Sequence, residues 1–187
     1  MSRTQYYCAA SLDGFIAESD DSIEWLAGYR GSYDGPDAEP GGRGSYERFY
    51  EGVGALVMGS ATYSFVIDEL TEWPYRGKPA WVLTGRNLPA PDGEDVRIGK
   101  ADVGDLHAEM LQAANDRNLW VVGGGNVASQ FADAGLLDDV IVTVVPVVLG
   151  EGKPLFDRRL PGGPMQLEGT RIFDSGMVEL RYSMPHK

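Results

Sequence analysis

The sequence predicts an α/β protein with a mixed, mostly parallel central sheet and helices on both of its faces. Apolar runs rich in β-branched residues alternate with segments of helical periodicity, which gives repeated strand–helix units along the chain. The last two strand-like runs are joined by Ser175-Gly176, which predicts an antiparallel hairpin at one edge of the sheet. No repeat or shift in composition divides the 187 residues, so we expect one domain spanning residues 1–187.

The strands are predicted from short apolar runs bounded by glycine, proline and acidic turn residues. They are Tyr6–Leu12, Phe15–Ala17, Ala55–Met58, Pro79–Thr84, Val96–Ile98, Leu119–Val122, Val140–Leu149, Gln166–Asp174 and Met177–Met184. We expect the first of them to be central in the sheet. Because Pro146 has no N–H to donate, we expect Val140–Leu149 to lie at an edge or to bend there.

The helices are predicted where a capping residue precedes apolar residues at helical spacing. They are a short turn within Asp20–Leu26, Ser45–Glu51, a helix from Gly59 to about Glu69, a helix from Asp102 or Val103 to Arg117, and Asn126–Ala134. Ser45 is a suitable N-cap, and Gly135 is a suitable residue to end the last helix. Between Gly28 and Gly44 the chain is rich in Gly, Pro, Asp and Ser, which predicts a long surface loop. Such a loop is either functional or a plain connection.

Composition limits the classes of ligand. The formal net charge of −12 argues against a duplex-DNA binder, because such proteins gain affinity from cationic contacts with phosphates. No apolar run approaches the ~20 residues of a membrane span, and no signal-peptide core is visible, so we expect a cytoplasmic protein. The single cysteine, Cys8, and the two histidines form no metal-ligand pattern, so no metal is expected.

A run of three glycines is the strongest sign of a ligand. Leu119–Val122 is followed by Gly123, Gly124 and Gly125, and a predicted helix begins directly after them. Glycines let a backbone approach a ligand closely, and the first N–H groups of a helix attract anions. In an acidic chain this pattern predicts a site for a small phosphorylated cofactor. The alternative is a tight strand-to-helix turn with no ligand.

Two further strand ends have a similar layout. Gly59-Ser60-Ala61-Thr62 begins a helix directly after a strand, and its hydroxyls could donate to phosphate or could simply cap the helix. Thr84-Gly85-Arg86 follows another strand, and Arg86 could bind an adenosine 2′-phosphate or remain a plain exposed arginine. Because ligands of open α/β sheets bind at the carboxyl ends of strands, the three junctions together favour a dinucleotide site.

Four segments of the chain resemble the dihydrofolate reductase superfamily. The resemblance is closest to the reductase domain of bifunctional riboflavin-biosynthesis enzymes, the RibD C-terminal-domain type. The segments are Ala9–Ala17, similar to S-x-D-G-x-I-A; Met58–Tyr63, similar to G-R-x-T-Y; Val121–Asn126, similar to G-G-G/A; and Pro146–Phe156, similar to P-x-x-L-G-x-G-x-x-L-F. They occur in the family's order and extend over nearly the whole chain.

The resemblance implies a dihydrofolate-reductase-like three-layer α/β/α fold, NADPH as hydride donor and a homodimer. By position, it implies a nicotinamide site at Ala9, Ala10 and Ile16, an adenosine site at Gly59, Ser60 and Thr62, a 2′-phosphate site at Thr84 and Arg86, and a pyrophosphate site at Gly123, Gly124, Gly125, Asn126 and Val127. Ser60 stands where the family often has arginine, so this chain lacks one cation on the side of the 2′-phosphate. The family's preceding deaminase domain and its zinc motif are not found in this sequence, so a stand-alone reductase is expected.

The function that we expect is therefore NADPH-dependent hydride transfer to a small heterocycle, either pterin-like or similar to a pyrimidine precursor of riboflavin. The candidate proton donors are Asp13 and Glu47, although Asp13 could instead shape the Asp13-Gly14 turn. Trp25, Tyr46 and Tyr50 could enclose the flat substrate or could serve only in packing. The alternatives are an NADP(H)- or heterocycle-binding protein without turnover and, least favoured, a structural protein.

Overall fold

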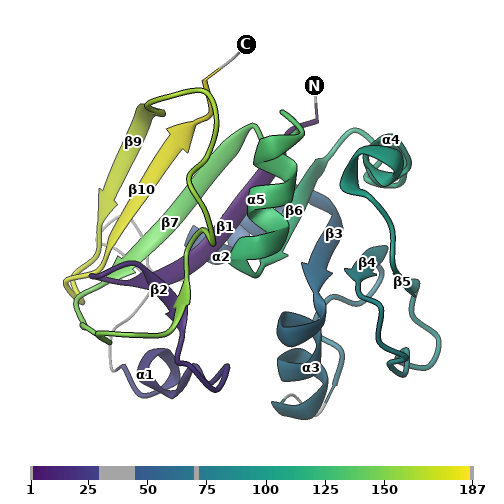
Figure 1. Cartoon of the computed structure of the whole chain (residues 1–187), viewed down its shortest axis with the longest axis horizontal. Coiled ribbons are helices and arrows are strands. Elements are labelled where there is room, and N and C mark those ends of the chain that lie inside the picture. Colours follow the sequence, from purple (N-terminus) through teal and green to yellow (C-terminus); the bar gives the residue numbers. More distant parts are fainter. Residues whose placement is uncertain (1, 30–44, 70–71, 186–187) are drawn as a thin grey trace.

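The computed structural model describes residues 2–29, 45–69 and 72–185. In this part of the chain, eight strands form one mixed sheet (Figure 1). In the order in which they lie side by side, they are β5 (Val96–Gly99), β4 (Ala80–Leu83), β3 (Val53–Gly59), β6 (Asn118–Gly123), β1 (Thr4–Ser11), β7 (Asp139–Val145), β10 (Val178–Ser183) and β9 (Gln166–Ile172). A separate pair consists of β2 (Phe15–Ala17) and β8 (Lys153–Pro154).

The sheet is parallel except at its last edge. From β5 to β7 every neighbouring pair of strands is parallel, whereas β10 is antiparallel to both β7 and β9. The first strand, β1, lies between β6 and β7, as its apolar composition predicts. The predicted sheet type and the closing hairpin are thus confirmed.

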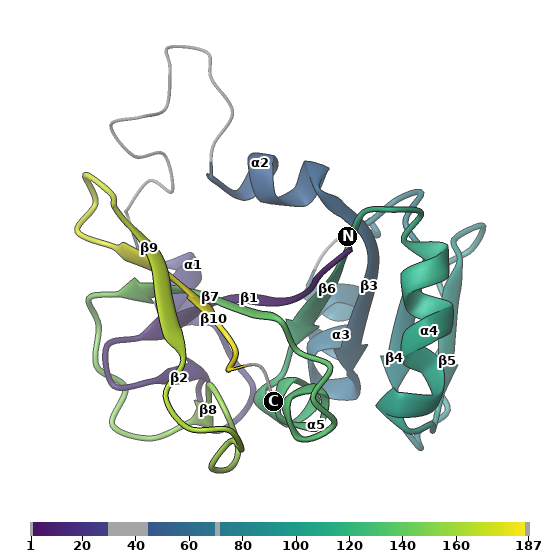
Figure 2. The ribbon, with the colours of Figure 1, turned by 90° about the horizontal axis from the view of Figure 1, so that it is seen from above.

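Helices cover both faces of the sheet. On one face α4 (Val103–Ala113) and α5 (Gly125–Asp133) pack against a core that includes Tyr6, Val57 and Phe131. On the other face, α2 (Ser45–Glu51) and α3 (Ser60–Glu69) pack against a core that includes Tyr7 and Trp120. Tyr6 and Tyr7 point to opposite faces because successive side chains alternate along a strand. Figure 2 shows α2 and α5 on opposite sides of β1, which confirms the three layers.

Three local predictions are corrected by the structure. β7 ends at Val145, short of the predicted Leu149, and it lies inside the sheet, so Pro146 neither marks an edge strand nor bends β7 but follows its last residue. α4 ends at Ala113, short of the predicted Arg117, because Asn115 and Asp116 adopt left-handed φ angles of 52° and 62°. The segment from Gly150 to Pro154, which the sequence predicts as a turn or loop, contains β8, which pairs with β2.

The short helix α1 (Glu24–Ala27) lies where a helical turn is predicted. The predicted long loop from Gly28 to Gly44 falls almost wholly outside the described residues. None of the helices in the described ranges is long and apolar enough to cross a membrane.

Candidate functional site

A cavity of about 980 Å³ lies at the carboxyl ends of β1, β3 and β6. Its size is at the upper end of the usual range for sites of small ligands and cofactors. Twelve of the residues predicted for cofactor, substrate or proton transfer line it: Ala9, Ile16, Tyr46, Glu47, Gly59, Ser60, Thr62, Gly123, Gly124, Gly125, Asn126 and Val127. Most of the residues predicted for the site therefore lie around one cavity.

The three glycines differ in what the fold requires of them. Gly123 has a φ of 150°, which side chains rarely adopt, and a Cβ atom there would lie 3.3 Å from Thr62 Oγ1. A Cβ atom on Gly125 would lie 2.4 Å from the backbone oxygen of Pro154, so there is no room for one. At Gly124 the nearest atom to an added Cβ is Ile16 Cδ1 at 3.7 Å, an ordinary contact. The fold therefore requires Gly123 and Gly125, whereas a side chain at Gly124 would only occupy cavity space.

Two helix N-termini face this cavity side by side. Gly124 is the N-cap of α5 and has an extended conformation without a side-chain cap. β3 and β6 are neighbours, and Gly59 at the end of β3 lies so close to α5 that an added Cβ would be 3.3 Å from Val127 Cγ2. The first amides of α3 and α5 have no acceptors within their own helices, so both helices offer donors to an anion between them.

Charged side chains also surround this end of the cavity. Asn126 Nδ2 donates to Asp157 Oδ2 at 2.6 Å, and Arg158 Nε donates to Asp157 Oδ1 at 2.8 Å. Hydrogen bonds from Arg158 and then from Asn126 hold the pKa of Asp157 well below its usual range. Lys153 also lines the cavity, with its Nζ 3.5 Å from Asp21 Oδ1. Lys153 brings a cation to the cavity, and we did not predict it because its segment lacks a recognisable strand pattern.

Five aromatic rings also line the cavity, and we call the part that they line the aromatic chamber: Tyr7, Tyr46, Phe65, Tyr75 and Trp120. Tyr75 and Tyr46 contact Trp120 edge-on, at centroid separations of 5.5 and 6.0 Å. Burial raises the pKa of Tyr46 to about 12, so this phenol stays protonated at neutral pH. The chamber is suited to a flat, largely apolar ring system.

One polar group in the cavity wall has no partner. Thr143 of β7 is 1% exposed, lines the cavity and has a hydroxyl without a hydrogen-bond partner in the described part of the chain. A buried hydroxyl without a partner costs free energy, which a ligand that hydrogen-bonds to it would recover. Thr143 was not predicted from the sequence. The signal was present, because it is the only polar residue in the run Val140–Val145.

Cys8 lines the same cavity but is not suited to nucleophilic chemistry. Burial raises the pKa of its thiol to about 12, so the reactive thiolate is not formed near neutral pH. Cys8 therefore serves as a small apolar residue, as a single cysteine within an apolar strand is expected to do.

Asp13, a predicted proton donor, does not line the cavity. Its carboxylate accepts hydrogen bonds from Ser11 Oγ at 2.7 Å, from the Gly150 amide at 2.7 Å and from the Leu149 amide at 3.1 Å. These bonds, the one from Ser11 above all, lower the pKa of Asp13 to about 2. Asp13 therefore joins the end of β1 to the segment after β7, and it is ionised near neutral pH.

The other predicted residues outside the cavity wall have different surroundings. Ala10 is 2% exposed within β1, and Trp25 packs beside the small core of Val145, Phe173 and Met177. Tyr50 stacks behind Tyr46 at a centroid separation of 5.7 Å. Thr84 and Arg86 follow Leu83, which does line the cavity, and the guanidinium of Arg86 is exposed. Arg86 is thus exposed three positions beyond a residue of the cavity wall, whereas Trp25 and Tyr50 lie in packing positions.

The strand order, the antiparallel hairpin and the cavity at the carboxyl ends of the parallel strands define a dihydrofolate-reductase-like protein. The chain belongs to the RibD C-terminal domain family, whose pattern matches residues 73–178. It is similar to the protein YwjB of Bacillus subtilis (strain 168), with 33% identity over 182 residues that cover 96% of this chain and 97% of YwjB.

Solved structures agree with this assignment. A Shewanella sp. PV-4 protein named for riboflavin biosynthesis has a TM-score of 0.78 and 28% identity, and the match covers 98% of this chain and 99% of that one. Dihydrofolate reductase from Enterococcus faecalis has a TM-score of 0.60 and 16% identity, with coverage of 98% and 97%, and so shares the fold. The reductase-like fold inferred from the four sequence segments is thereby confirmed.

Proposed function

We propose that the protein is an NADPH-dependent reductase that transfers a hydride to a small heterocycle, pterin-like or similar to a pyrimidine precursor of riboflavin. The observation that carries the proposal is the lining of the cavity at the carboxyl ends of β1, β3 and β6, which combines two helix N-termini with the aromatic chamber. A dinucleotide with an anionic centre and a substrate with a flat ring require this combination.

The residues present fit NADPH. Beside Gly124 there is space that a Cβ atom would fill. This space lies at the start of α5, where a pyrophosphate would accept hydrogen bonds from backbone N–H groups. Ser60 and Thr62 would contact the adenosine half, and Arg86 would pair with the 2′-phosphate. Ala9 and Ile16 would leave room for the nicotinamide ring at the junction with the aromatic chamber. The solved reductase from E. faecalis, which shares the fold, was complexed with NADP(H).

The bound cofactor would supply the hydride, and the chain would position the acceptor. Tyr7, Tyr46 and Trp120 would hold the substrate ring by stacking and would exclude water from the reacting face. The unpaired hydroxyl of Thr143 would bind a ring nitrogen or oxygen and so fix the orientation of the ring. Of the two predicted proton donors, we favour Glu47, because it lines the cavity and Asp13 is held ionised outside it.

The test is the oxidation of NADPH, followed at 340 nm, with a panel of dihydropterins, aminopyrimidines and flavins. We expect turnover with one class, loss of turnover in Glu47→Gln, and retained NADPH binding in that variant. NADPH that binds but is never oxidised across the panel would favour the second candidate, an NADP(H)-binding protein without turnover. The exposed position of Glu47 at the cavity wall is the observation that supports this second candidate.

We also propose that the protein forms a homodimer. β9 is one of the two outer strands of the sheet, and it exposes two large apolar side chains, Leu167 at 51% and Ile172 at 69%. Exposed apolar groups on an edge strand are typical of an interface. Light scattering should give twice the mass of the chain, and Ile172→Lys should reduce it; a monomer in the unmodified protein would refute the proposal.

A further inference from the structure

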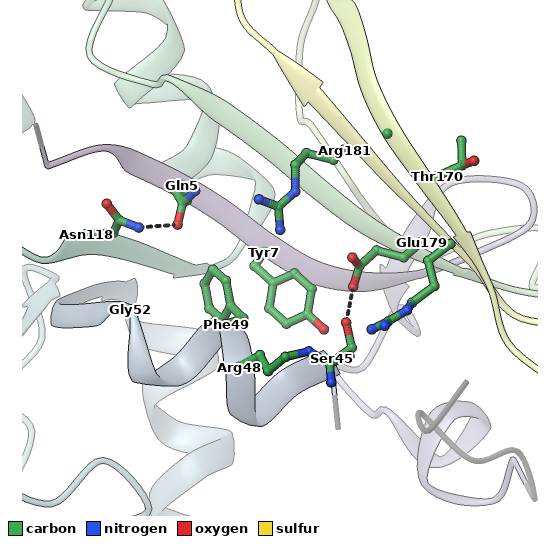
Figure 3. A pocket seen from close by; sticks show the side chains of 12 residues that line it. Gln5, Tyr7, Ser45, Arg48, Phe49, Gly52, Asn118, Thr170, Glu179 and Arg181 are labelled. Carbon is green, nitrogen blue, oxygen red and sulfur yellow. Dashed lines mark hydrogen bonds between the residues drawn. The ribbon is translucent and has the colours of Figure 1, made fainter. Parts of the chain in front are cut away.

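A second cavity, of about 370 Å³, lies on the sheet face that α2 and α3 cover. It is enclosed by α2, by the start of β1 and by the hairpin of β9 and β10, and we call it the hairpin pocket. Figure 3 shows Arg181 and Glu179 projecting from the hairpin toward α2, with Tyr7 between Arg181 and the helix. None of the predicted site residues lines the hairpin pocket.

Strand register brings its charged groups together. Arg181 lies opposite Ile141 of β7, which is itself opposite Tyr7, so all three side chains face α2. Glu179 of β10 lies opposite Arg171 of β9. A guanidinium from α2, that of Arg48, completes the set, so three arginines and one glutamate line the pocket.

This concentration of positive charge contrasts with the chain as a whole, whose formal net charge is −12. Glu179 offsets part of it and accepts a hydrogen bond from Ser45 Oγ at 3.0 Å. The guanidinium of Arg181 makes no ion pair with any residue within the described ranges. Planar guanidiniums bind carboxylates and phosphates through paired hydrogen bonds, so a pocket lined by three of them favours an anionic ligand.

The pocket wall also has an apolar part. The rings of Tyr7 and Phe49 pack together at a centroid separation of 4.4 Å and form one side of the pocket. Uncharged polar groups, among them Gln5 and Asn118, line the end nearest the start of β1. The volume, the guanidiniums and the aromatic side together suit a small organic molecule that carries its charges at one end.

We propose that the hairpin pocket is a second ligand site, which binds a small organic polyanion, either a polycarboxylate or a phosphate ester. Arg181 and Arg171 hold the anionic groups from the hairpin, and Arg48 holds them from α2. The site is separate from the cavity of about 980 Å³ at the carboxyl ends of β1, β3 and β6, which we call the main cavity, although Tyr7 lines both. The proposal requires neither NADPH nor turnover, so it can fail while the proposed reductase function stands.

The experiment is calorimetric titration of the full chain with citrate and, separately, with inorganic pyrophosphate, at constant ionic strength set with sodium chloride. We expect saturable binding of at least one of the two, which distinguishes carboxylate from phosphate ligands. Arg181→Gln should weaken it at least tenfold, as expected for loss of hydrogen bonds to a charged group. Arg117→Gln is the matched control, because Arg117 is exposed and lines neither cavity.

Thr170→Glu provides an independent variant, because Thr170 is exposed and lines the pocket, so a carboxylate there repels an anion without disturbing the core. Thermal unfolding should show that all variants are folded. Binding of neither probe to the unmodified chain would overturn the proposal. So would equal weakening in Arg117→Gln, which indicates general charge attraction, or displacement of the probe by saturating NADPH, which places the anion in the main cavity.

Discussion

Gly124→Asp separates the two roles that three consecutive glycines can have, which are to permit a backbone turn and to leave space for a ligand. The φ of Gly124 is −84°, which any residue can adopt, and an added Cβ would have its nearest contact 3.7 Å away at Ile16. We therefore expect the variant to fold with nearly unchanged stability. Gly125→Ala is the contrasting variant, because its Cβ would lie 2.4 Å from a backbone oxygen of Pro154.

The expected loss of NADPH affinity follows from Coulomb's law. Two unit charges about 4 Å apart interact with about 4 kcal/mol at an effective dielectric constant of about 20. Solvent in the open cavity screens the repulsion between the new carboxylate and the pyrophosphate, and we take the screening to halve the interaction energy. The remaining repulsion of about 2 kcal/mol corresponds to a roughly thirtyfold increase in Kd. Gly124→Asn has nearly the same volume without the charge, so it isolates the steric part.

NADPH binding is measured by the change in its fluorescence, and stability by thermal unfolding. We expect Gly124→Asp to bind at least roughly thirtyfold more weakly, with little change in Tm. Gly125→Ala should instead lose about 1–3 kcal/mol of stability, as overpacked sites do, and its Tm should fall by several degrees. An unchanged Kd for NADPH in a folded Gly124→Asp variant would refute the assignment of the pyrophosphate to the start of α5.

Three further predictions concern single side chains. Arg86→Ala should reduce the preference for NADPH over NADH about tenfold, measured as the ratio of the two Kd values; an unchanged ratio excludes Arg86 as the 2′-phosphate ligand. Asp13→Asn should destabilise the fold at neutral pH. Because folding lowers the pKa of Asp13 from 3.8 to about 2, its contribution is present above about pH 4 and is lost as the pH falls through 2, so the Tm difference should shrink toward pH 2. A difference that is constant with pH would contradict this role. Thr143→Val should leave the urea midpoint unchanged or raise it, because the hydroxyl has no hydrogen-bond partner among the described residues, while substrate KM rises; a lower midpoint would show a structural role for the hydroxyl.

The sequence predicted most of the sheet because its signals are local. Buried parallel strands are continuous apolar runs, and the residues that flank them form turns because of conformational preferences that do not depend on tertiary structure. The ends of elements were less certain, since they depend on single residues such as Asn115 and Asp116, whose left-handed φ angles end α4 early. The interior position of β7 could not be predicted, because it depends on which strand the C-terminal hairpin joins.

The candidate site divides in the same way. Local pattern identified the three glycines and the start of α3, because a strand that ends in glycine before a helix forms a phosphate site from neighbouring residues. The roles of Asp13 and Thr143 were decided by distant partners. Asp13 accepts hydrogen bonds from the backbone amides of residues 149 and 150. Thr143 lines the cavity only because β7 lies beside β1.

The sequence by itself thus determined the α/β class and the glycine loop at the carboxyl ends of the strands, because both follow from the periodicity and conformational limits of consecutive residues. Only the tertiary structure decided which glycine leaves space for a ligand. The deciding contacts are with residues distant in the sequence. A Cβ atom on Gly125 would collide with the backbone oxygen of Pro154, whereas one on Gly124 would make only an ordinary contact with Ile16. The hairpin pocket is likewise a product of strand pairing, which places Arg48, Arg171 and Arg181 around one space although they lie far apart in the sequence.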